Sequence, residues 1–280
     1  TTSIYDQCER PTMYTPLGLA YLAAAVRQHG HDPVILDCLA EGWRTREKRD
    51  GETRYGLSPD AIAARVREAG PDVVGITSMF SGFDRDAREL AAIVRRTVPD
   101  VPVLVGGADA SADSASLIQD PAIDLIVRGE GENTLVAILD HLARHKTLPD
   151  DLPGTTTKTA RNPDAEHIDN LDTVPTPARD LLPMHIYQER QRAIMPYAKR
   201  TPIGFVISSR GCPYNCVFCS TRNVWKRWRP RSAGNVGDEM DQLVNDYGVR
   251  EIAFLDDSFV AWPPRVEEIC NEIVRRNLKI

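Results

Sequence analysis

Three cysteines lie close together in the segment SSRGCPYNCVFCSTRNVWKRWRPRS, residues 208–232. Cys212, Cys216 and Cys219 have the spacing C-x3-C-x2-C. A closed structural zinc site and a ferredoxin-type cluster each take four protein ligands. Three thiolates leave one position open, which fits a zinc ion with a free coordination position or a cubane iron–sulfur cluster with one iron free for a substrate or cofactor. The cluster fits this pattern best.

The other cysteines do not supply a fourth ligand. Cys270 lies in VEEICNEIV beside Ile269, at the spacing of core residues, and is expected to be a small buried apolar side chain. Cys8 is expected in a loop and Cys38 at a strand end, without a partner pattern. Six cysteines with three crowded together do not resemble a disulfide framework, so a reducing cytoplasm is expected.

The cysteines follow the predicted strand PIGFVISS directly, at the end of a strand where α/β and barrel folds build their sites. A helix over about 232–247, a strand over 250–257 and a helix over 263–277 are expected after them. The C-terminal part therefore consists of two βα units.

The first half of the chain alternates helices with apolar strands. Helices are expected over 16–30, 58–70, 84–99, 112–119 and 132–145, and strands over 32–38, 71–78, 101–107 and 122–131. The strands are continuous apolar runs, which is typical of a parallel sheet covered by helices on both faces. The pattern predicts a doubly wound, Rossmann-like α/β domain over 1–145.

Two segments lie outside this alternation. Residues 146–200 hold seven prolines and the sequence PGTTTKTARNPD, which predicts a linker with a small hairpin between the first domain and the βα units of 201–280. No strand is expected in the first fifteen residues, so the first domain is expected to lack its first strand. Residues 44–54 are expected to form a solvated loop.

Charge is distributed unevenly along the 280 residues. The net charge is −6, but residues 185–231 carry +9 and the remainder carries −15. A basic stretch with tyrosines and tryptophans could bind nucleic acid, but a site for anionic small molecules is favoured because the positive charge surrounds the cysteines. No apolar run approaches the roughly 20 residues of a membrane span, and the N-terminus lacks a secretory signal pattern.

The cysteine motif, its position after a strand and the aromatic Phe218 before the last cysteine resemble the radical S-adenosylmethionine (SAM) enzymes. The resemblance implies that Cys212, Cys216 and Cys219 hold a [4Fe-4S] cluster whose open iron binds the amino and carboxylate groups of SAM. It also implies a partial (β/α) barrel, of which residues 201–280 are the beginning.

The family's second barrel strand ends in a motif that contacts the SAM amino group. Here that strand ends in FLDDSF, so the resemblance implies that Asp256 and Asp257, with Phe218, bind SAM. The alternative is that the two aspartates only cap the strand end.

The N-terminal domain, together with TVPTPARDLLP, resembles the cobalamin-binding subgroup of this family. Many corrinoid domains carry D-x-H-x-x-G, and residues 37–42 read D-C-L-A-E-G, with Leu39 in the histidine position. This departure implies cobalamin bound without a protein histidine on cobalt. The cobalamin-binding residues that the resemblance implies are Asp37, Leu39, Gly42, Thr77, Ser78, Gly106, Gly107, Gly129, Glu130 and Glu132.

The resemblance implies a cobalamin-dependent radical SAM methyltransferase. A 5′-deoxyadenosyl radical would take hydrogen from an unactivated substrate carbon, and methylcobalamin would deliver the methyl group. No catalytic side chain is assigned, because the cofactors carry the chemistry. Two alternatives stay open: a radical SAM oxidative cyclase or rearrangement enzyme, and a non-catalytic corrinoid or zinc-binding protein.

Expected partners are a small-molecule or peptide substrate and an electron donor such as flavodoxin or ferredoxin, with neither nucleic acid nor membrane. Because a first strand and further barrel units are missing from the pattern, the chain is expected to be a fragment that does not turn over alone.

Overall fold

A computed structural model of the chain describes residues 2–5, 13–49 and 52–280. The chain forms two compact units, each with its own hydrophobic core. Unit 1 comprises Thr1–Pro11 and Gly18–His167, and unit 2 comprises Thr12–Leu17 and Ile168–Ile280. The division at His167 falls inside the proline-rich segment 146–200. Within the described ranges, no helix has both the length and the apolar character needed to span a bilayer.

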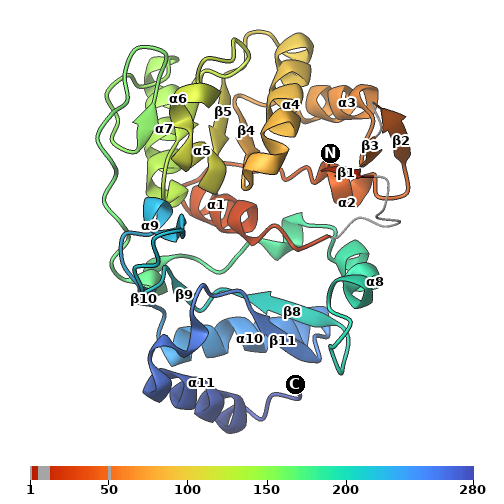
Figure 1. Cartoon of the computed structure of the whole chain (residues 1–280), viewed down its shortest axis with the longest axis vertical. Coiled ribbons are helices and arrows are strands. Elements are labelled where there is room, and N and C mark those ends of the chain that lie inside the picture. The colour runs from red at the N-terminus through yellow and green to blue at the C-terminus, as the bar shows by residue number, and fades with distance from the viewer. Residues whose placement is uncertain (1, 6–12, 50–51) are drawn as a thin grey trace. The chain divides into compact units, whose positions relative to one another are not determined.

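Unit 1 is built on a four-stranded sheet with the strand order β4-β5-β6-β7 (Figure 1). Its strands are β4 (Val74–Thr77), β5 (Val103–Gly106), β6 (Leu125–Val127) and β7 (Thr155–Thr156). The first three pair in parallel, and β7 pairs antiparallel with β6. The helices of this unit are α1 (Leu17–Gln28), α2 (Cys38–Glu41), α3 (Pro59–Ala69), α4 (Asp84–Thr97), α5 (Ala108–Ala112), α6 (Ser114–Leu117) and α7 (Gly131–His145), with the 3-10 turn η1 (Ser81–Phe83). This alternation confirms the predicted α/β class.

Local sequence signals explain where the regular helices begin and end. The Ser58 hydroxyl accepts a hydrogen bond from the Ala61 N–H at 3.2 Å and caps α3, with Pro59 in the first turn. Gly70 ends the same helix in the left-handed region at φ 53°. The helix expected over 112–119 is wrong in detail. Two short helices, α5 and α6, occupy this region because Asp113 leaves helical geometry and accepts a hydrogen bond from the Ser116 N–H.

The N-terminal region differs from the expectation in two places. β1 (Thr2–Tyr5) precedes the first helix, and β2 (Arg46–Arg49) and β3 (Glu52–Tyr55) occupy the stretch expected to be a solvated loop. The three form a separate antiparallel sheet in the order β1-β3-β2, and not an extension of the parallel sheet. Arg54 of β3 is buried because its guanidinium pairs with Asp86 and Glu89 of α4. An arginine-rich sequence therefore forms ordered strands here.

The strand expected over 32–38 is absent. Residues 32–37 have no regular secondary structure, and Cys38–Glu41 form the short helix α2. The Asp37 carboxylate accepts hydrogen bonds from the Leu39 and Ala40 N–H groups, both at 3.0 Å, so it caps this helix. An apolar run becomes a strand only where it finds a pairing partner, and none of the sheets in the described part of the chain includes these residues.

The proline-rich segment contributes structure to both units. In unit 1, β7 joins the sheet, and Thr156 also bridges to Arg161, which gives the expected small hairpin. In unit 2, the segment forms η2 (Leu171–Thr173), η3 (Arg179–Leu181) and α8 (Met184–Ile194).

Unit 2 contains the two expected βα units. Its elements are β8 (Ile203–Val206), β9 (Ser209–Arg210), α9 (Thr221–Val224), β10 (Arg229–Pro230), α10 (Ala233–Tyr247), β11 (Glu251–Phe254), η4 (Phe259–Ala261) and α11 (Pro263–Arg275). β8 and β11 pair in parallel, and β9 and β10 pair antiparallel. The Ser232 hydroxyl accepts a hydrogen bond from the Asn235 N–H at 3.1 Å and caps α10.

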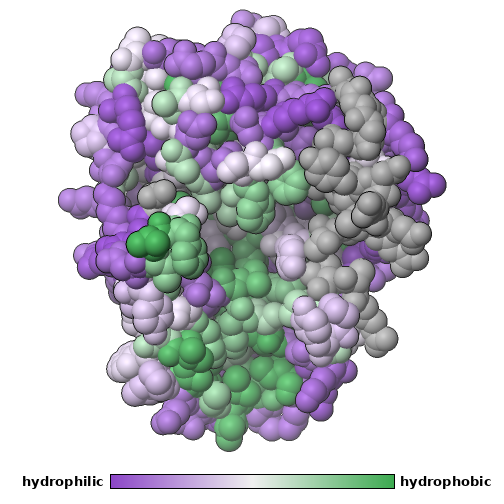
Figure 2. Space-filling model, in the orientation of Figure 1, coloured by the Kyte–Doolittle hydropathy of each residue, from purple (hydrophilic) through white to green (hydrophobic). Residues whose placement is uncertain are grey.

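The core of unit 2 lies between these strands and helices α10 and α11. Its buried side chains are Val206, Val236, Met240, Leu243, Val249 and Ile269. Cys270 is exposed, so its assignment to the core is wrong: the helix turns it away while Ile269 faces inward. Hydrophobic residues also reach the surface of unit 2 (Figure 2), among them Leu255, Val260 and Trp262 after β11.

Gly107→Ala tests the packing at the end of β5. Gly107 has φ 113°, and a Cβ there would lie 2.4 Å from the Ser78 carbonyl oxygen. We expect the substitution to lower the free energy of unfolding by about 2 kcal/mol or more, since it adds both strain and a backbone clash. Urea unfolding followed by circular dichroism measures this. Gly75→Ala in β4 is the control, because a Cβ there has nothing within 4 Å. Equal effects of the two substitutions would contradict the prediction.

Candidate functional site

The cysteine loop of unit 2 is closed at its base by backbone pairing. Arg210 of β9 pairs with Arg229 of β10, and Ser209 pairs with Pro230. Gly211 follows β9 at φ 81°, where a Cβ would lie 2.5 Å from the Arg227 carbonyl oxygen. Glycine is required at this point because the two ends of the loop approach so closely.

The three cysteines lie in the loop that this base supports. Cys212 is partly buried, and Cys216 and Cys219 are exposed. The Cys219 N–H donates to the Cys216 carbonyl at 3.1 Å, which makes a tight turn between them. Phe218 is 89% exposed, so it does not pack into the core of the unit. Hydrogen bonds from Thr221, first from its side chain and then from its backbone, lower the pKa of the Cys219 thiol.

The thiols share one loop but do not converge on a common centre. In the part of the chain that the structure describes, no three histidine, cysteine or acidic side chains are gathered into a metal-binding group. The donor set nevertheless fits an iron–sulfur cluster. Loop residues 211–220 contain three thiols and no histidine or carboxylate that would compete as a ligand.

The two aspartates after β11 differ in their surroundings. Asp256 accepts hydrogen bonds from the Ser208 N–H and the Ser208 hydroxyl, both at 2.7 Å, and from the Ser209 hydroxyl. Both of its carboxylate oxygens are therefore engaged with the strand that leads into the cysteine loop.

Asp257 is oriented toward the loop itself. The residue is exposed, but desolvation of its carboxyl, followed by the Asp256 charge, raises the pKa of Asp257, and the Gly211 N–H acts in the opposite direction. The Asp257 charge in turn acts on the Cys219 thiol, where it opposes the lowering of the pKa by Thr221. Asp257 thus lies near both ends of the cysteine loop.

Three of the predicted cobalamin-binding segments of unit 1 lie at one edge of the parallel sheet. The Ser78 hydroxyl, after β4, donates to the buried Asp109 carboxylate at 2.7 Å. The Ser111 hydroxyl, after β5, donates to the Gly107 carbonyl at 2.7 Å and accepts from the Gly129 N–H, after β6, at 2.9 Å. Hydrogen bonds therefore link the carboxyl ends of β4, β5 and β6, where open α/β sheets bind ligands.

The glycines of this edge serve different purposes. Gly107 makes room for the Ser78 carbonyl, and a Cβ on Gly106 would make ordinary contact with Val127 at 3.4 Å. A Cβ on Gly129 would meet nothing within 4 Å, and this residue has φ 72°. Gly129 therefore leaves open space beside the sheet edge, which suits a large planar ligand.

Two acidic residues and a histidine follow β6. Glu130 and Glu132 are buried, and the Glu130 carboxylate lies 3.0 Å from Nδ1 of His167. No role was expected for His167, and the sequence holds no local signal for it because 37 residues separate the pair. His167 fixes the loop from β6 into α7.

Apolar side chains border the same edge and were also not expected from the sequence. Met79, Phe80 and Phe83 follow Ser78 and are exposed by 49%, 65% and 38%. The rings of Phe80 and Phe83 meet edge to face, with centroids 6.1 Å apart. These exposed apolar groups follow β4, and the open space at Gly129 follows β6, at the same edge of the sheet.

The fourth predicted cobalamin-binding segment, residues 37–42, is held by local contacts. Asp37 caps α2, and Leu39 is partly buried. A Cβ on Gly42 would lie 2.1 Å from the Leu57 backbone nitrogen. Gly42 is therefore explained by the close approach of residues 56–57, which gives it a packing role whether or not cobalamin is bound. Thr77, at the end of β4, is exposed.

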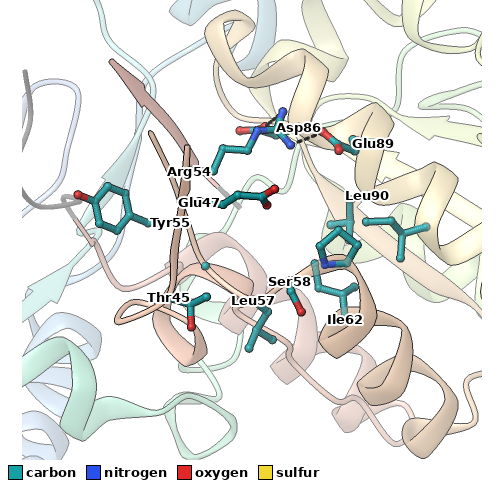
Figure 3. Close-up of a pocket in the computed structure, with 13 residues that line it drawn as sticks. Thr45, Glu47, Arg54, Tyr55, Leu57, Ser58, Ile62, Asp86, Glu89 and Leu90 are labelled. Atoms are coloured by element: carbon teal, nitrogen blue, oxygen red, sulfur yellow. Dashed lines mark hydrogen bonds and ion pairs between the residues drawn. The ribbon is translucent and has the colours of Figure 1, made fainter. Parts of the chain in front are cut away.

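A pocket in unit 1 lies apart from these predicted cobalamin-binding segments. Figure 3 shows Arg54 paired with Asp86 and Glu89 on one side and Leu57, Ser58, Ile62 and Leu90 on the other. None of the cobalamin-binding residues expected from the sequence lines it. Its lining carries one arginine and three acidic residues, Glu47, Asp86 and Glu89, and ion pairs with Asp86 and Glu89 engage the arginine.

Comparison with known families agrees with the two-unit organisation. Residues 9–139 match the B12 binding domain, and residues 206–280 match the Radical SAM superfamily. The first match covers the sheet of unit 1 through β6. The second begins at the last residue of β8 and includes the cysteine loop, Asp256 and Asp257.

Curated relatives are similar along nearly the whole chain. An uncharacterized methyltransferase, PH0819, from Pyrococcus horikoshii is 37% identical over 95% of this chain and 53% of its own length. Cytidylyl-2-hydroxyethylphosphonate methyltransferase from Streptomyces wedmorensis is 31% identical over 89% of this chain and 52% of its own. Anaerobic magnesium-protoporphyrin IX monomethyl ester cyclase from Rubrivivax gelatinosus is 25% identical over 95% and 46%. The chain thus spans about half the length of the curated relatives it matches.

A solved structure shares the fold. The radical SAM methyltransferase TsrM from Kitasatospora setae, with tryptophan and a SAM analogue bound, aligns with a TM-score of 0.72 at 22% identity. The alignment covers 96% of this chain and 50% of TsrM. The chain therefore belongs to the radical SAM proteins that carry a B12 binding domain, and it is homologous to cobalamin-dependent radical SAM methyltransferases.

Proposed function

We propose that this chain is part of a cobalamin-dependent radical SAM methyltransferase that acts on an unactivated carbon of a small-molecule substrate. The observation that carries the proposal is the three-thiol loop at the carboxyl end of β8, in the same chain as a B12 binding domain. Three ligands without a fourth suit a cluster that must keep one iron open.

The residues of unit 2 would hold the cluster and SAM. Cys212, Cys216 and Cys219 are the cluster ligands, and the depressed thiol pKa of Cys219 favours the thiolate that binds iron. Asp257 is the acid that would meet the SAM amino group, because it lies near both ends of the loop. The exposed ring of Phe218 can cover the bound molecule from the loop.

The residues of unit 1 would hold cobalamin. The linked carboxyl ends of β4, β5 and β6 supply Thr77, Ser78, Gly106, Gly107, Gly129, Glu130 and Glu132. Asp37, Leu39 and Gly42 form the remaining cobalamin-binding segment. Leu39 has no atom that can coordinate cobalt, so residue 39 can contact the corrin only through apolar packing and its backbone groups.

The bound cofactors would supply the chemistry: the cluster an electron that cleaves SAM, and cobalamin a methyl group. The protein binds and orients them and excludes water. The reaction requires an external electron donor, which we place among acidic carriers such as flavodoxin or ferredoxin because the residues around the cysteines are basic. We place the protein in the cytoplasm, where thiols stay reduced.

A cyclase is the second candidate, because some relatives are named as magnesium-protoporphyrin IX monomethyl ester cyclases. SAM labelled with deuterium in its methyl group separates the two. A methyltransferase passes the label into the product, whereas a cyclase consumes SAM and leaves the product unlabelled. An unlabelled product would contradict methyl transfer.

Anaerobic reconstitution with iron and sulfide is expected to give about four irons per chain, as a cubane cluster requires. Cys212→Ala, Cys216→Ala and Cys219→Ala should each lose most of this iron, because each thiol holds one corner of the cube. Cys270→Ala is the matched control, since Cys270 is an exposed cysteine outside the loop. Iron and sulfide assays with the spectrum of the reduced cluster measure the outcome. Tight binding of zinc without iron would support the non-catalytic alternative instead.

Cobalamin is expected to bind without a protein histidine on cobalt, since Leu39 stands in the histidine position. Electron paramagnetic resonance of the cob(II)alamin form reports the axial nitrogen directly. We expect no splitting from a protein imidazole, and the spectrum should be the same after His167→Gln, which removes the histidine beside Glu130. A nitrogen splitting that disappears in this variant would identify His167 as a ligand and overturn the prediction.

A further inference from the structure

Ser208 lies between β8 and β9, four residues before Cys212, and it is completely buried. All of its hydrogen-bonding groups are engaged. The N–H and hydroxyl donate to the two carboxylate oxygens of Asp256, each at 2.7 Å. The carbonyl accepts from the Arg265 guanidinium and from the Arg231 N–H, the latter at 2.9 Å. Both peptide groups that flank the Ser208 Cα are therefore held in place.

The groups that hold Ser208 come from three separate parts of unit 2. Asp256 follows β11, Arg265 lies in the first turn of α11, and Arg231 precedes α10. The Arg265 Nε also donates to the Arg231 carbonyl at 3.1 Å, and an Arg231 Nη1 donates to the Ile207 carbonyl at 2.9 Å. The contacts link the carboxyl ends of both parallel strands to the start of the cysteine loop.

Burial of the Arg265 guanidinium is energetically unfavourable. It is 2% exposed, and its Nη1 has no hydrogen-bond partner within the described part of the chain. Burial lowers the pKa of Arg265, and the nearby Asp256 charge opposes this effect. A buried arginine with an unsatisfied nitrogen adds little to stability by itself, so its hydrogen bonds to the loop entrance are the better reason for its presence.

We propose that Asp256 and Arg265 are positioning residues that fix the start of the cysteine loop, which leaves Asp257 for the SAM contact proposed above. Only the SAM contact of Asp257 rests on the proposed function. The two aspartates that the sequence pairs have different roles: Asp256 acts on Ser208 and Ser209, whereas Asp257 faces the loop. The positioning role of Asp256 and Arg265 concerns the cysteine loop alone and holds with or without a cofactor.

The first test measures thiol reactivity in the cofactor-free full chain. Cys212 is partly buried, and its alkylation by iodoacetamide, followed by peptide mass spectrometry, reports opening of the loop base. Asp256→Ala and Arg265→Met should raise its rate about fivefold or more, the change expected from the loss of one buried hydrogen bond. Cys270, exposed on α11, should react at an unchanged rate in every variant.

Conservative variants separate positioning from general instability. Asp256→Asn and Arg265→Lys keep part of the hydrogen bonding and should give intermediate rates. Arg275→Met, an exposed position of the same helix that pairs with Glu272, is the matched control and should leave Cys212 unchanged. If Asp256→Ala or Arg265→Met unfolds the unit, the conservative pair decides. The proposal would be overturned if Cys212 reacted at the wild-type rate in both conservative variants and in whichever of Asp256→Ala and Arg265→Met folds.

The second test separates the two aspartates after reconstitution. Asp256→Ala should bind less iron per chain, whereas Asp257→Ala should bind as much as the wild type but lose the change that SAM produces in the spectrum of the reduced cluster. Equal loss of iron in both variants would refute the division of roles. Failure of the wild type to take up iron would refute the proposed function instead, and the thiol reactivity of the cofactor-free chain would still test the loop base.

Discussion

The hydrogen bonds around Ser208 are the constraint on which the arrangement of unit 2 depends. β8 and β11 are only four residues long, and a pair of short parallel strands does not by itself define the path of the chain beyond its carboxyl ends. Asp256 and Arg265 hold Ser208, the second residue beyond β8, through its N–H and its carbonyl oxygen. The β9–β10 pair and the close approach at Gly211 then close the loop, so the cysteines can be exposed on an ordered base.

Unit 1 uses serine hydroxyls for a similar purpose. Hydroxyls of Ser78 and Ser111 connect the ends of three strands, and Gly107 allows the chain after β4 to approach the chain after β5. The open space at Gly129 and the exposed Phe80 follow from this arrangement. A large cofactor with a roughly planar ring needs a broad and open edge, whereas a cluster needs a few thiols on a fixed loop. The two units meet these different requirements at the carboxyl ends of parallel strands.

The sequence predicts those features that depend on neighbouring residues. Ser58 and Ser232 mark helix starts through their own hydroxyls, and the spacing of the three cysteines indicates a cluster without any knowledge of the fold. Features that depend on distant partners were not predictable. Residues 32–37 have the composition of a strand, but no strand of the described part of the chain pairs with them. Arg54 is held by ion pairs with Asp86 and Glu89, which lie more than thirty positions further along the chain. The hydrogen bonds that distinguish Asp256 from Asp257 likewise involve Ser208, which is distant in sequence.

The most direct test of the central claim, that three thiols hold a cluster with one open iron, is Mössbauer spectroscopy of the chain reconstituted with ⁵⁷Fe. We predict one iron site of the four whose parameters change when SAM is added, while the three thiolate-bound sites keep theirs. The change should be absent in Asp257→Ala. Four sites that do not respond to SAM in the wild-type chain would contradict the account.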